Sequence, residues 1–368
     1  MQSIPFLSLA PQHDRIREEL ERAFKNVLDG GKLILASEVE AFEKEYAAFS
    51  SVQHCIAVAS GLDALFISLK VLGIGKGDEV IVPALTCAPT WMAVSRTDAT
   101  LVPVDADPGT FNMSVSQLNQ LITGKTKAIV PVNLYGRPAD LPAVLRITDN
   151  KNIFIVEDNA QGHGASIQGR PTGSFGILNA TSFYPTKNLG ALGDGGAITT
   201  NDSRYAEKAR RYRNYGTTRR FQHDEIGINS RLDELQAAFL RIKLKHLEAW
   251  NDERRMYAAL LRDMLEGVGD LTMPENAIGM NPAHHLFVIC TAKRNALKEF
   301  LTTQGVGTDV HYPVPPHLQG AYRFMGFAKG SFPVTEKICD TILSLPLWPG
   351  MGEESVRYVG QRVKKFFE

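Results

Sequence analysis

Cysteine is scarce in this chain of 368 residues. Only Cys55, Cys87, Cys290 and Cys339 are present, widely spaced and without a CxxC pair. This pattern argues against a disulfide framework and against a structural zinc site, and it is typical of reduced thiols in a cytosol. We therefore expect a cytoplasmic protein without a metal site.

The chain also lacks an excess charge of one sign and a long apolar run. It holds 40 Lys and Arg residues against 40 Asp and Glu residues, so its charge predicts no nucleic-acid or membrane partner. No apolar run approaches the roughly 18–20 residues that span a bilayer. The first residues, Met1–Phe6, lack the cationic start and apolar core of a signal peptide. With 44% hydrophobic residues, the chain can bury a sizeable core in more than one domain.

Short apolar runs alternate with helical patterns over the first two thirds of the chain. The predicted strands are 55–59, 79–83, 101–104, 128–132, 154–157, 180–184 and 197–200. The predicted helices are 12–29, 37–49, 63–72, 115–122 and 139–148. In the second of these, Ser37 is predicted as the N-cap, with Glu40 completing a capping box. Buried strands with helices between them indicate a mostly parallel sheet covered on both faces, an α/β fold.

A change of composition divides the chain near residue 250. Residues 231–264 form a long helical pattern rich in Leu, Ala, Arg and Glu. Later predicted elements are a strand at 285–290, a helix at 293–304 and a loop rich in His and Pro at 309–317. We predict a large domain over residues 1–249, beginning with a helical arm, and a smaller C-terminal α/β domain over residues 250–368.

Lys187 lies between a strand-like run and the glycine-rich loop Gly193–Gly196. A lysine amine that is deprotonated and held in place forms a Schiff base with an aldehyde. Ser182, five residues earlier, could bind the phosphate of the same cofactor. An isolated lysine in such a loop is more commonly a solvated surface charge, so the rest of the chain decides between the two interpretations.

Two further segments supply what a phosphorylated aldehyde requires. Asp158 ends an apolar strand, and ligands of open α/β sheets collect at the carboxyl ends of strands. The turn Ser60-Gly61 precedes a helix, whose first N–H groups and dipole favour a phosphate. Alone, Asp158 is equally a helix cap, and Ser60-Gly61 a common turn. Together with Lys187 they match pyridoxal 5′-phosphate, which needs a lysine, an anion beside its ring nitrogen, and phosphate donors.

Three motifs follow one another along the chain. They are Glu157-Asp158-x-Ala160-Gln161-x-His163-Gly164, then Ser182-Phe183 followed by Lys187-Asn188, and Gly227-Ile228-Asn229-Ser230-Arg231-Leu232. With these motifs the chain resembles, over nearly its whole length, the sugar aminotransferases called the DegT/DnrJ/EryC1/StrS group. The resemblance implies the fold of aspartate aminotransferase (fold type I), a large domain with a mostly parallel sheet and a smaller C-terminal α/β domain.

The resemblance also implies roles at the cofactor. Lys187 would form the Schiff base and then move the proton between substrate and cofactor. Asp158 would pair with the pyridinium nitrogen, and Gln161 would contact the ring hydroxyl. Further implied cofactor-binding residues are Gly61, Leu62 and Ser182 for the phosphate, Cys87 for the ring, and Asn229 for the phosphate in the neighbouring subunit. The active unit would be a homodimer with its active sites at the subunit interface.

Two positions depart from the family pattern. Leu62 stands where many members have threonine, so only backbone donors are available there for the phosphate. Cys87 stands where members commonly have an aromatic ring that stacks on the cofactor, and its thiol gives a smaller, polarizable contact. Trp91, four residues on, is open to two interpretations, as a replacement for that ring or as part of the core.

The resemblance implies a two-step transamination. Some members carry histidine in place of the lysine and act as dehydratases, which Lys187 argues against. L-glutamate would give its amino group to the cofactor, which would pass it to the keto group of a nucleotide-linked sugar. The best match is to enzymes that aminate carbon 3 of TDP-3-keto-6-deoxyhexoses, for lipopolysaccharide O-antigen, surface-layer or antibiotic sugars. Alternatives are a 4-keto sugar nucleotide or keto-cyclitol aminotransferase, and a regulator that binds the cofactor without turnover.

Six residues are candidates for substrate contact. They are His163, Tyr184, Arg231, His311, Tyr312 and His317. His163 can also be explained as a loop histidine with structural partners, and the segment around His311 as a structural proline-rich turn. Arg219 and Arg220 could hold the diphosphate of the substrate or form an ordinary solvated pair.

Overall fold

The computed structural model describes residues 3–219, 221–275 and 279–368. Its main sheet has seven strands in the order β1-β9-β8-β5-β4-β2-β3. The strands are β1 His54–Val58, β2 Glu79–Pro83, β3 Thr100–Val104, β4 Thr126–Ile129, β5 Phe154–Asp158, β8 Leu178–Ser182 and β9 Gly196–Thr200. Within this sheet, β9 pairs antiparallel with β1 and β8, and the other neighbours pair parallel. The predicted mostly parallel sheet is confirmed.

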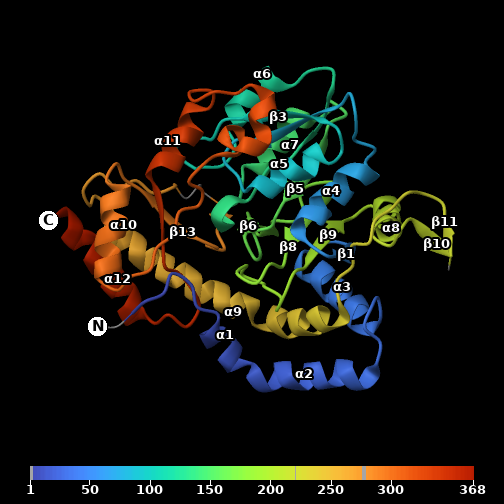
Figure 1. Ribbon diagram of the computed structural model, residues 1–368, viewed down its shortest axis with the longest axis horizontal. Coiled ribbons are helices and arrows are strands. Elements are labelled where there is room, and N and C mark those ends of the chain that lie inside the picture. Colours follow the sequence, from blue (N-terminus) through green and yellow to red (C-terminus); the bar gives the residue numbers. More distant parts are fainter. Residues whose placement is uncertain (1–2, 220, 276–278) are drawn as a thin grey trace.

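Helices cover both faces of the sheet (Figure 1). On one face lie α4 Gly61–Val71, α5 Ala88–Ser95 and α8 Ser203–Tyr212; on the other lie α3 Ser37–Phe49, α9 Glu234–Leu265, α6 Leu118–Leu121 and α7 Leu141–Thr148. Because successive side chains of a strand point to opposite faces, Ile56 packs under α4 while Cys55 and Ala57 pack under α3 and α9. The side chains of these near-continuous apolar strands therefore contribute to two hydrophobic cores, one on each face of the sheet.

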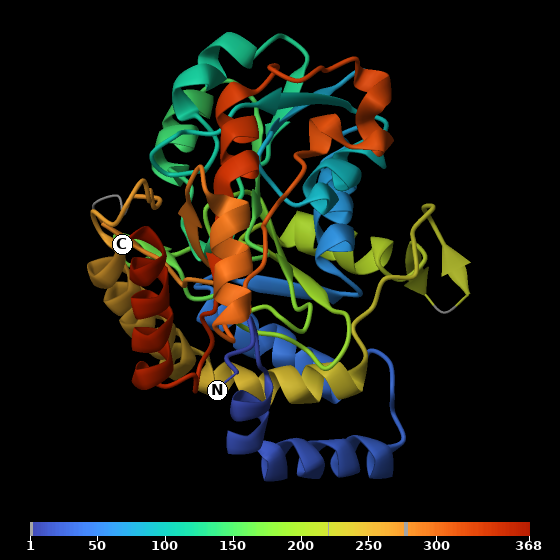
Figure 2. The same ribbon diagram turned by 60° about the vertical axis from the view of Figure 1, so that its left-hand side comes forward.

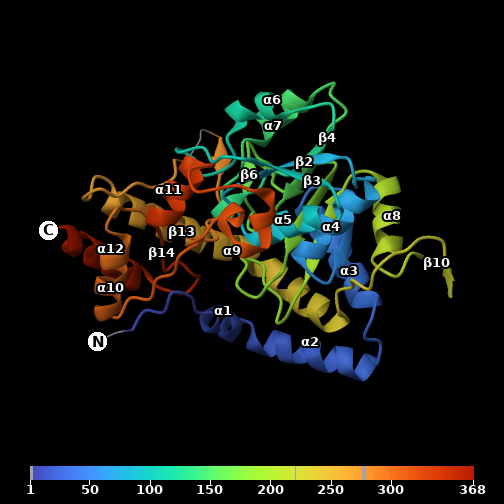
Figure 3. The same cartoon turned by 45° about the horizontal axis from the view of Figure 1, so that its top comes forward.

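The N-terminal arm runs beside α9, away from the sheet (Figures 1 and 3). It consists of α1 Ala10–Arg15 and α2 Arg17–Gly30, so the single predicted helix over 12–29 is interrupted at Ile16. The backbone of Ile16 is not helical there, and its side chain is buried with Leu20 against Phe239 and Trp250 of α9. Burial of Ile16 thus fixes the arm on α9.

The predicted N-cap of α3 is wrong. The helix begins at Ser37, its N-cap residue is Ala36, and the Ser37 side chain makes no cap. Instead the buried carboxylate of Glu234, at the start of α9, accepts hydrogen bonds from the backbone N–H groups of Ala36 (2.7 Å), Glu38 (2.8 Å) and Val39 (3.1 Å). A charged acceptor from a packed neighbouring helix satisfies several free N–H groups at once, which one serine hydroxyl cannot do.

The C-terminal part of the chain builds a second core beside α9 (Figure 2). Its elements are β13 Phe287–Cys290, β14 Ile342–Leu345, α10 Arg294–Thr303 and α12 Glu353–Phe367, and β13 pairs antiparallel with β14. The second half of α9 joins this core through Tyr257 and Leu261, and so does Ile4 from the N-terminus. Because α9 runs through residues 249 and 250, it serves both cores, and the domain boundary placed there stays a prediction.

The remaining elements are short. They are η1 Val115–Gln117, η2 Leu134–Gly136, β6 Ser166–Ile167, β7 Arg170–Pro171, β10 Thr217–Arg219, β11 Gln222–His223, β12 Met280–Asn281, η3 Pro316–Leu318, η4 Gly320–Met325 and α11 Pro333–Thr341. The β10–β11 hairpin projects from the body of the molecule (Figure 1). Among the described residues, no helix has the length and apolarity needed to cross a membrane.

Candidate active site

Loops at one edge of the sheet line a cavity of about 380 Å³. They follow the carboxyl ends of β1, β2, β4, β5 and β8, which meet at this edge because these strands run in the same direction. The sequence-predicted residues that line the cavity are Gly61, Leu62, Cys87, Asp158, Gln161, Ser182, Tyr184, Lys187, His311 and Tyr312. Segments that are distant in the sequence thus bring most of the predicted residues into one space.

Lys187 stands in the loop after β8, with its side chain partly exposed to the cavity. Its backbone N–H donates to the carbonyl oxygen of Tyr184 at 2.9 Å. Burial lowers the pKa of the Lys187 amine, while nearby Cys87 and Asp158 act in the opposite direction. A lowered pKa leaves more of the amine unprotonated near neutral pH, which is the form that attacks a carbonyl carbon.

Asp158 ends β5 and directs its carboxylate to the same cavity. Its Oδ2 accepts from the Thr90 hydroxyl at 2.9 Å, and its Oδ1 accepts from the Ala160 N–H at 3.1 Å. Thr90 is itself hydrogen-bonded to Thr86 at 2.8 Å. Burial raises the pKa of Asp158, and the two hydrogen bonds and Lys187 oppose this shift. The sequence prediction missed Thr86 and Thr90, although both flank Cys87 within one helical turn.

The start of α4 forms a cradle for an anion. The Ser60 hydroxyl caps the helix by accepting from the Asp63 N–H at 3.1 Å, which leaves the N–H groups of Gly61 and Leu62 without an acceptor in the helix. A Cβ at position 61 would lie 2.6 Å from the Cβ of Ser182, so only glycine allows this close approach. Two backbone donors and the Ser182 hydroxyl therefore face the cavity together, as a phosphate requires.

Gln161 is held between two groups rather than left free. Its Oε1 accepts from the backbone N–H of Tyr135 at 2.5 Å, and its Nε2 donates to the Tyr312 hydroxyl at 3.1 Å. The Tyr312 hydroxyl also shares a hydrogen bond with Cys87. Burial raises the pKa of the Cys87 thiol and of the Tyr312 phenol, so both stay protonated at neutral pH.

Trp91 belongs to the core. Its side chain is fully buried, it donates to the carbonyl oxygen of Pro83 at 2.9 Å, and its ring meets that of Tyr322 edge-on at 5.0 Å. It therefore does not replace the aromatic ring that is missing at position 87. An aromatic ring from the 309–317 segment, that of Tyr312, lies beside Cys87 instead.

Histidines line the opposite side of the cavity. The Nδ1 of His311 is hydrogen-bonded to the Ser344 hydroxyl at 2.9 Å, and its ring stacks on Phe6. Tyr184 is half-exposed at the rim. His285, which the sequence prediction missed, is buried in the wall, and its Nδ1 has no hydrogen-bond partner among the described residues. The sequence analysis placed His285 only at the first position of the predicted strand 285–290, and that position does not predict a site.

Several predicted residues lie outside this lining. His163 is fully buried, with its Nε2 2.9 Å from the Thr181 hydroxyl, which supports its interpretation as a loop histidine. His317 is enclosed by Glu336 at 3.0 Å and by the ring of Phe332. Arg231 donates to Asn214 at 3.1 Å, and Asn229 is exposed. Arg219 lies on the exposed hairpin, and Arg220 lies outside the described residues.

The arrangement fits pyridoxal 5′-phosphate. Lys187, the Asp158 carboxylate and the anion cradle at α4 converge on one cavity, and these three groups suit the aldehyde, the ring nitrogen and the phosphate of this cofactor. In the described part of the chain, no group of three or more His, Cys, Asp or Glu side chains is placed to hold a metal ion.

Comparison with known proteins agrees with this geometry. The model of the DegT/DnrJ/EryC1/StrS aminotransferase family matches residues 14–364. The erythromycin biosynthesis sensory transduction protein EryC1 of Saccharopolyspora erythraea is 45% identical, over 97% of each chain. The dTDP-3-amino-3,6-dideoxy-alpha-D-galactopyranose transaminase of Aneurinibacillus thermoaerophilus is 42% identical, over 99% of each chain. The crystal structure of S. venezuelae DesV with a ketimine intermediate, 42% identical, superposes with a TM-score of 0.98 over 100% of this chain and 99% of DesV. The predicted aminotransferase fold is confirmed.

Proposed function

Because the chain belongs to the DegT/DnrJ/EryC1/StrS aminotransferase family, we propose that it uses pyridoxal 5′-phosphate to transfer an amino group from L-glutamate to carbon 3 of a TDP-linked 3-keto-6-deoxyhexose. The product is a TDP-3-amino-3,6-dideoxyhexose. The observation that carries the proposal is the convergence of Lys187, Asp158 and the first turn of α4 on one cavity. The likeness to the A. thermoaerophilus transaminase supports carbon 3 as the site of amination.

The residues of the cavity have separate roles in the proposed reaction. The bound cofactor supplies an electron sink for the bonds at the reacting carbon. Lys187 would hold the aldehyde of the cofactor and would take up and return the proton at the reacting carbon, which its lowered pKa favours. Asp158 would keep the ring nitrogen of the cofactor protonated, and Thr90 and Ala160 fix the direction of its carboxylate. The N–H groups of Gly61 and Leu62, with the Ser182 hydroxyl, hold the phosphate.

The substrate lies against the histidine side of the cavity. Tyr184, His311 and Tyr312 face this space, and His285 forms part of its wall, with a buried Nδ1 that has no hydrogen-bond partner within the described residues. Neutral imidazole and phenol groups suit sugar hydroxyls, because they donate or accept hydrogen bonds without a charge that must be neutralised. Arg231 does not line the cavity of its own subunit. Its contact with substrate therefore requires the second subunit of the dimer.

The active unit is a homodimer with its active sites at the subunit interface. Asn229 is exposed and does not line the cavity of its own subunit. In the proposed dimer it binds the phosphate held in the second subunit. Exposed apolar side chains on and after the arm support a large contact surface; they are Phe24 (49% exposed), Leu28 (63%), Leu33 (58%) and Ile34 (45%). A cytoplasmic location and a role in lipopolysaccharide O-antigen synthesis stay predictions.

A second candidate function is regulation by cofactor binding without turnover. The observation that favours it is the name of the S. erythraea relative, a sensory transduction protein. Against it stands Asp158 beside Lys187 in the cavity, since binding of the cofactor without turnover needs the amine but no anion beside the ring nitrogen. Amination at carbon 4, or of a keto-cyclitol, uses the same residues and differs only in the acceptor.

The absorption spectrum of the protein with pyridoxal phosphate, before and after L-glutamate, tests the proposal. Loss of the yellow band and growth of the near-ultraviolet band are expected in the wild type and in Lys76→Ala, which changes an exposed lysine. Lys187→Ala should show neither change. A panel of 3-keto and 4-keto sugar nucleotides and keto-cyclitols then identifies the acceptor. A yellow band that glutamate leaves unchanged, with no product from any acceptor, would favour the regulator.

A further inference from the structure

Lys243 is a buried lysine that the proposed chemistry does not use. It lies on α9, is 4% exposed, and burial lowers its pKa to about 8. Its Nζ donates to the carbonyl oxygen of Gly190 at 2.7 Å and to the Nε2 of His13 at 3.0 Å. A lysine is placed in the interior at a desolvation cost, so two short hydrogen bonds to fixed acceptors indicate a specific role.

Gly190 belongs to the tight loop that carries Lys187. A Cβ on Gly190 would lie 2.2 Å from the carbonyl oxygen of Pro185, so the two ends of the 185–190 segment are in direct contact. The Ala191 N–H donates to the Phe183 carbonyl at 2.8 Å and closes the loop. A carbonyl held at Gly190 therefore fixes the backbone on the far side of Lys187.

A second contact holds the same loop to the same helix. The Nδ2 of Asn188 donates to the Oδ1 of Asn251 and to the carbonyl oxygen of Ala283, both at 2.8 Å. Asn251 is buried on α9, eight residues after Lys243, or about 12 Å along the helix. Its Nδ2 donates to the carbonyl oxygen of His163 at 2.9 Å. Two points of the loop, one next to Lys187 and one three residues on, are thus fixed by α9.

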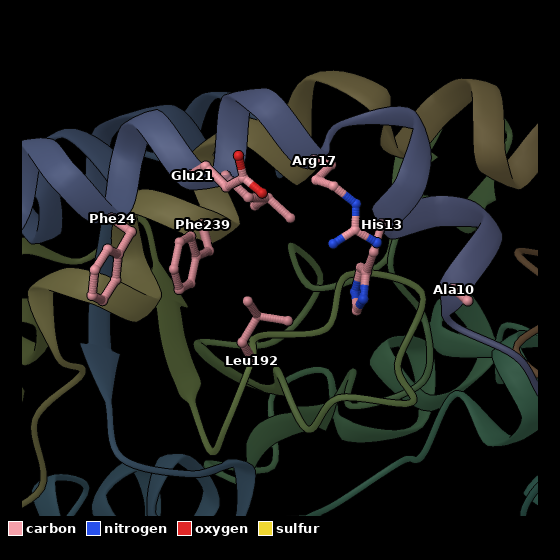
Figure 4. A pocket seen from close by; sticks show the side chains of 8 residues that line it. Ala10, His13, Arg17, Glu21, Phe24, Leu192 and Phe239 are labelled. Atoms are coloured by element: carbon pink, nitrogen blue, oxygen red, sulfur yellow. The ribbon is translucent and has the colours of Figure 1, made fainter.

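The N-terminal arm reaches this network through His13. Figure 4 shows His13 and Arg17 of the arm facing Leu192, which follows the Lys187 loop, across a hollow of about 520 Å³. Burial and the nearby Lys243 lower the pKa of His13, so its ring is neutral and its Nε2 can accept the hydrogen bond from the Lys243 ammonium group. The Leu192 N–H in turn donates to Gln236 of α9 at 2.8 Å.

We propose that Lys243 is a positioning residue that holds Lys187 in reacting geometry through the carbonyl group of Gly190, and that His13 links the N-terminal arm to this brace. Lys243 does not line the cavity, and its hydrogen bonds go to Gly190 and His13, so it acts on the reaction through the loop. The catalytic consequence rests on the proposed function, whereas the structural consequence does not. Reaction rates depend steeply on placement, because a displacement of about 1 Å can cost on the order of 100-fold.

Hydrogen exchange, cofactor absorption and steady-state kinetics test the brace in Lys243→Met, a substitution of similar length without donors. The matched control is Lys245→Met, which changes an exposed lysine two residues away on the same helix. We expect Lys243→Met to speed the exchange of backbone amides in residues 186–191 at least ~10-fold, since a braced loop opens rarely. We also expect a kcat lower by roughly 10- to 100-fold with KM changed less than about 3-fold. Lys245→Met should match the wild type.

Lys243→Gln keeps an NH2 donor group but is shorter and uncharged, so it should fall between the wild type and Lys243→Met in every measurement. It also serves if Lys243→Met does not fold. Normal exchange of the 186–191 amides in a folded Lys243 variant would overturn the proposal, whatever happens to the reaction rate. A wild type without transaminase activity would remove the proposed function and leave the exchange test valid.

The link to the arm has its own test. His13→Leu removes the second acceptor of Lys243 while leaving the Gly190 contact in place. Faster amide exchange in residues 186–191 by about 2- to 5-fold is expected, because the ammonium group loses one of its two fixed partners. Exchange equal to the wild type would restrict the brace to Lys243 and exclude the arm from it.

Discussion

Glu157 and Asp158 are adjacent on β5, yet their carboxylates serve different regions of the molecule. Glu157 is fully buried and accepts from Asn133 (2.7 Å), the Gly173 N–H (2.6 Å) and the Phe175 N–H (3.1 Å). Asp158 faces the cavity and Lys187 with two donors of its own. The comparison shows that two neighbouring acids are distinguished by their surroundings: a carboxylate whose acceptor positions are filled by the fold supports that fold, and one with positions open to a cavity is available to a ligand.

Asp158→Asn tests the functional role of the carboxylate that faces the cavity. An amide cannot hold a pyridinium nitrogen in its protonated form, so we expect kcat to fall by on the order of 10²–10³-fold. The free energy of unfolding should change little, because Asn retains an oxygen that can accept from Thr90 or Ala160. Steady-state kinetics and urea unfolding measure both quantities, with the exposed Asp149→Asn as control. An Asp158→Asn enzyme as active as the control would remove Asp158 from the site.

Glu157→Gln tests the structural role of the carboxylate that the fold encloses. The amide places an NH2 group where the carboxylate accepts from backbone N–H groups, so one buried donor meets another. Hydrogen bonds to a charged group contribute about 1.5–3 kcal/mol, and we expect the free energy of unfolding to fall by about that amount. The kcat of the folded enzyme should stay within about threefold of the wild type. A large loss of kcat without loss of stability would mean that the two carboxylates do not divide their roles.

Local patterns predicted much of the fold and part of the site. Short apolar runs between helical patterns located all seven strands of the main sheet. Each strand is buried on both faces, so its sequence is a nearly continuous apolar segment. Asp158 and Lys187 were predicted because strand ends and the loops after them point to the cavity. The order of the seven strands and the antiparallel direction of β9 follow from packing between distant segments, which no local pattern encodes.

Contacts between residues that are distant in the sequence were not predictable. Glu234 caps α3 from 198 residues away, His285 enters the cavity wall from the segment just before β13, and Lys243 binds a carbonyl group 53 residues earlier. Each of these side chains has an ordinary local setting, in a helix or before a strand. Their roles arise only when the chain is folded, because the partner is supplied by another element.

Glu234→Ala extends the comparison to a third buried carboxylate, one whose donors are all backbone N–H groups of a helix start. As in Glu157, the acceptor positions of its carboxylate are occupied by donors of the fold. Its loss should therefore affect stability and not catalysis. Removal of a helix cap costs about 0.5–2 kcal/mol, and we expect a loss of this size in urea unfolding with kcat unchanged. Exchange of the amides of Glu38 and Val39 should rise. A loss of kcat at full stability would contradict the structural role.

Asp158 also acts on Lys187, which gives the comparison its finest test. Burial lowers the pKa of Lys187, and the negative charge of Asp158 partly reverses the shift. Asp158→Asn removes that charge, so the pKa of Lys187 should fall further, and the free amine should persist to lower pH than in the wild type. Glu157→Gln should leave this pKa unchanged, because Glu157 is not among the groups that shift it. The pH dependence of Lys187 alkylation by acrylonitrile in the apo-protein, followed by mass spectrometry of the 183–196 peptide, measures it. If the midpoint moves upward in Asp158→Asn, or moves equally in both variants, the charge of Asp158 does not raise the pKa of Lys187.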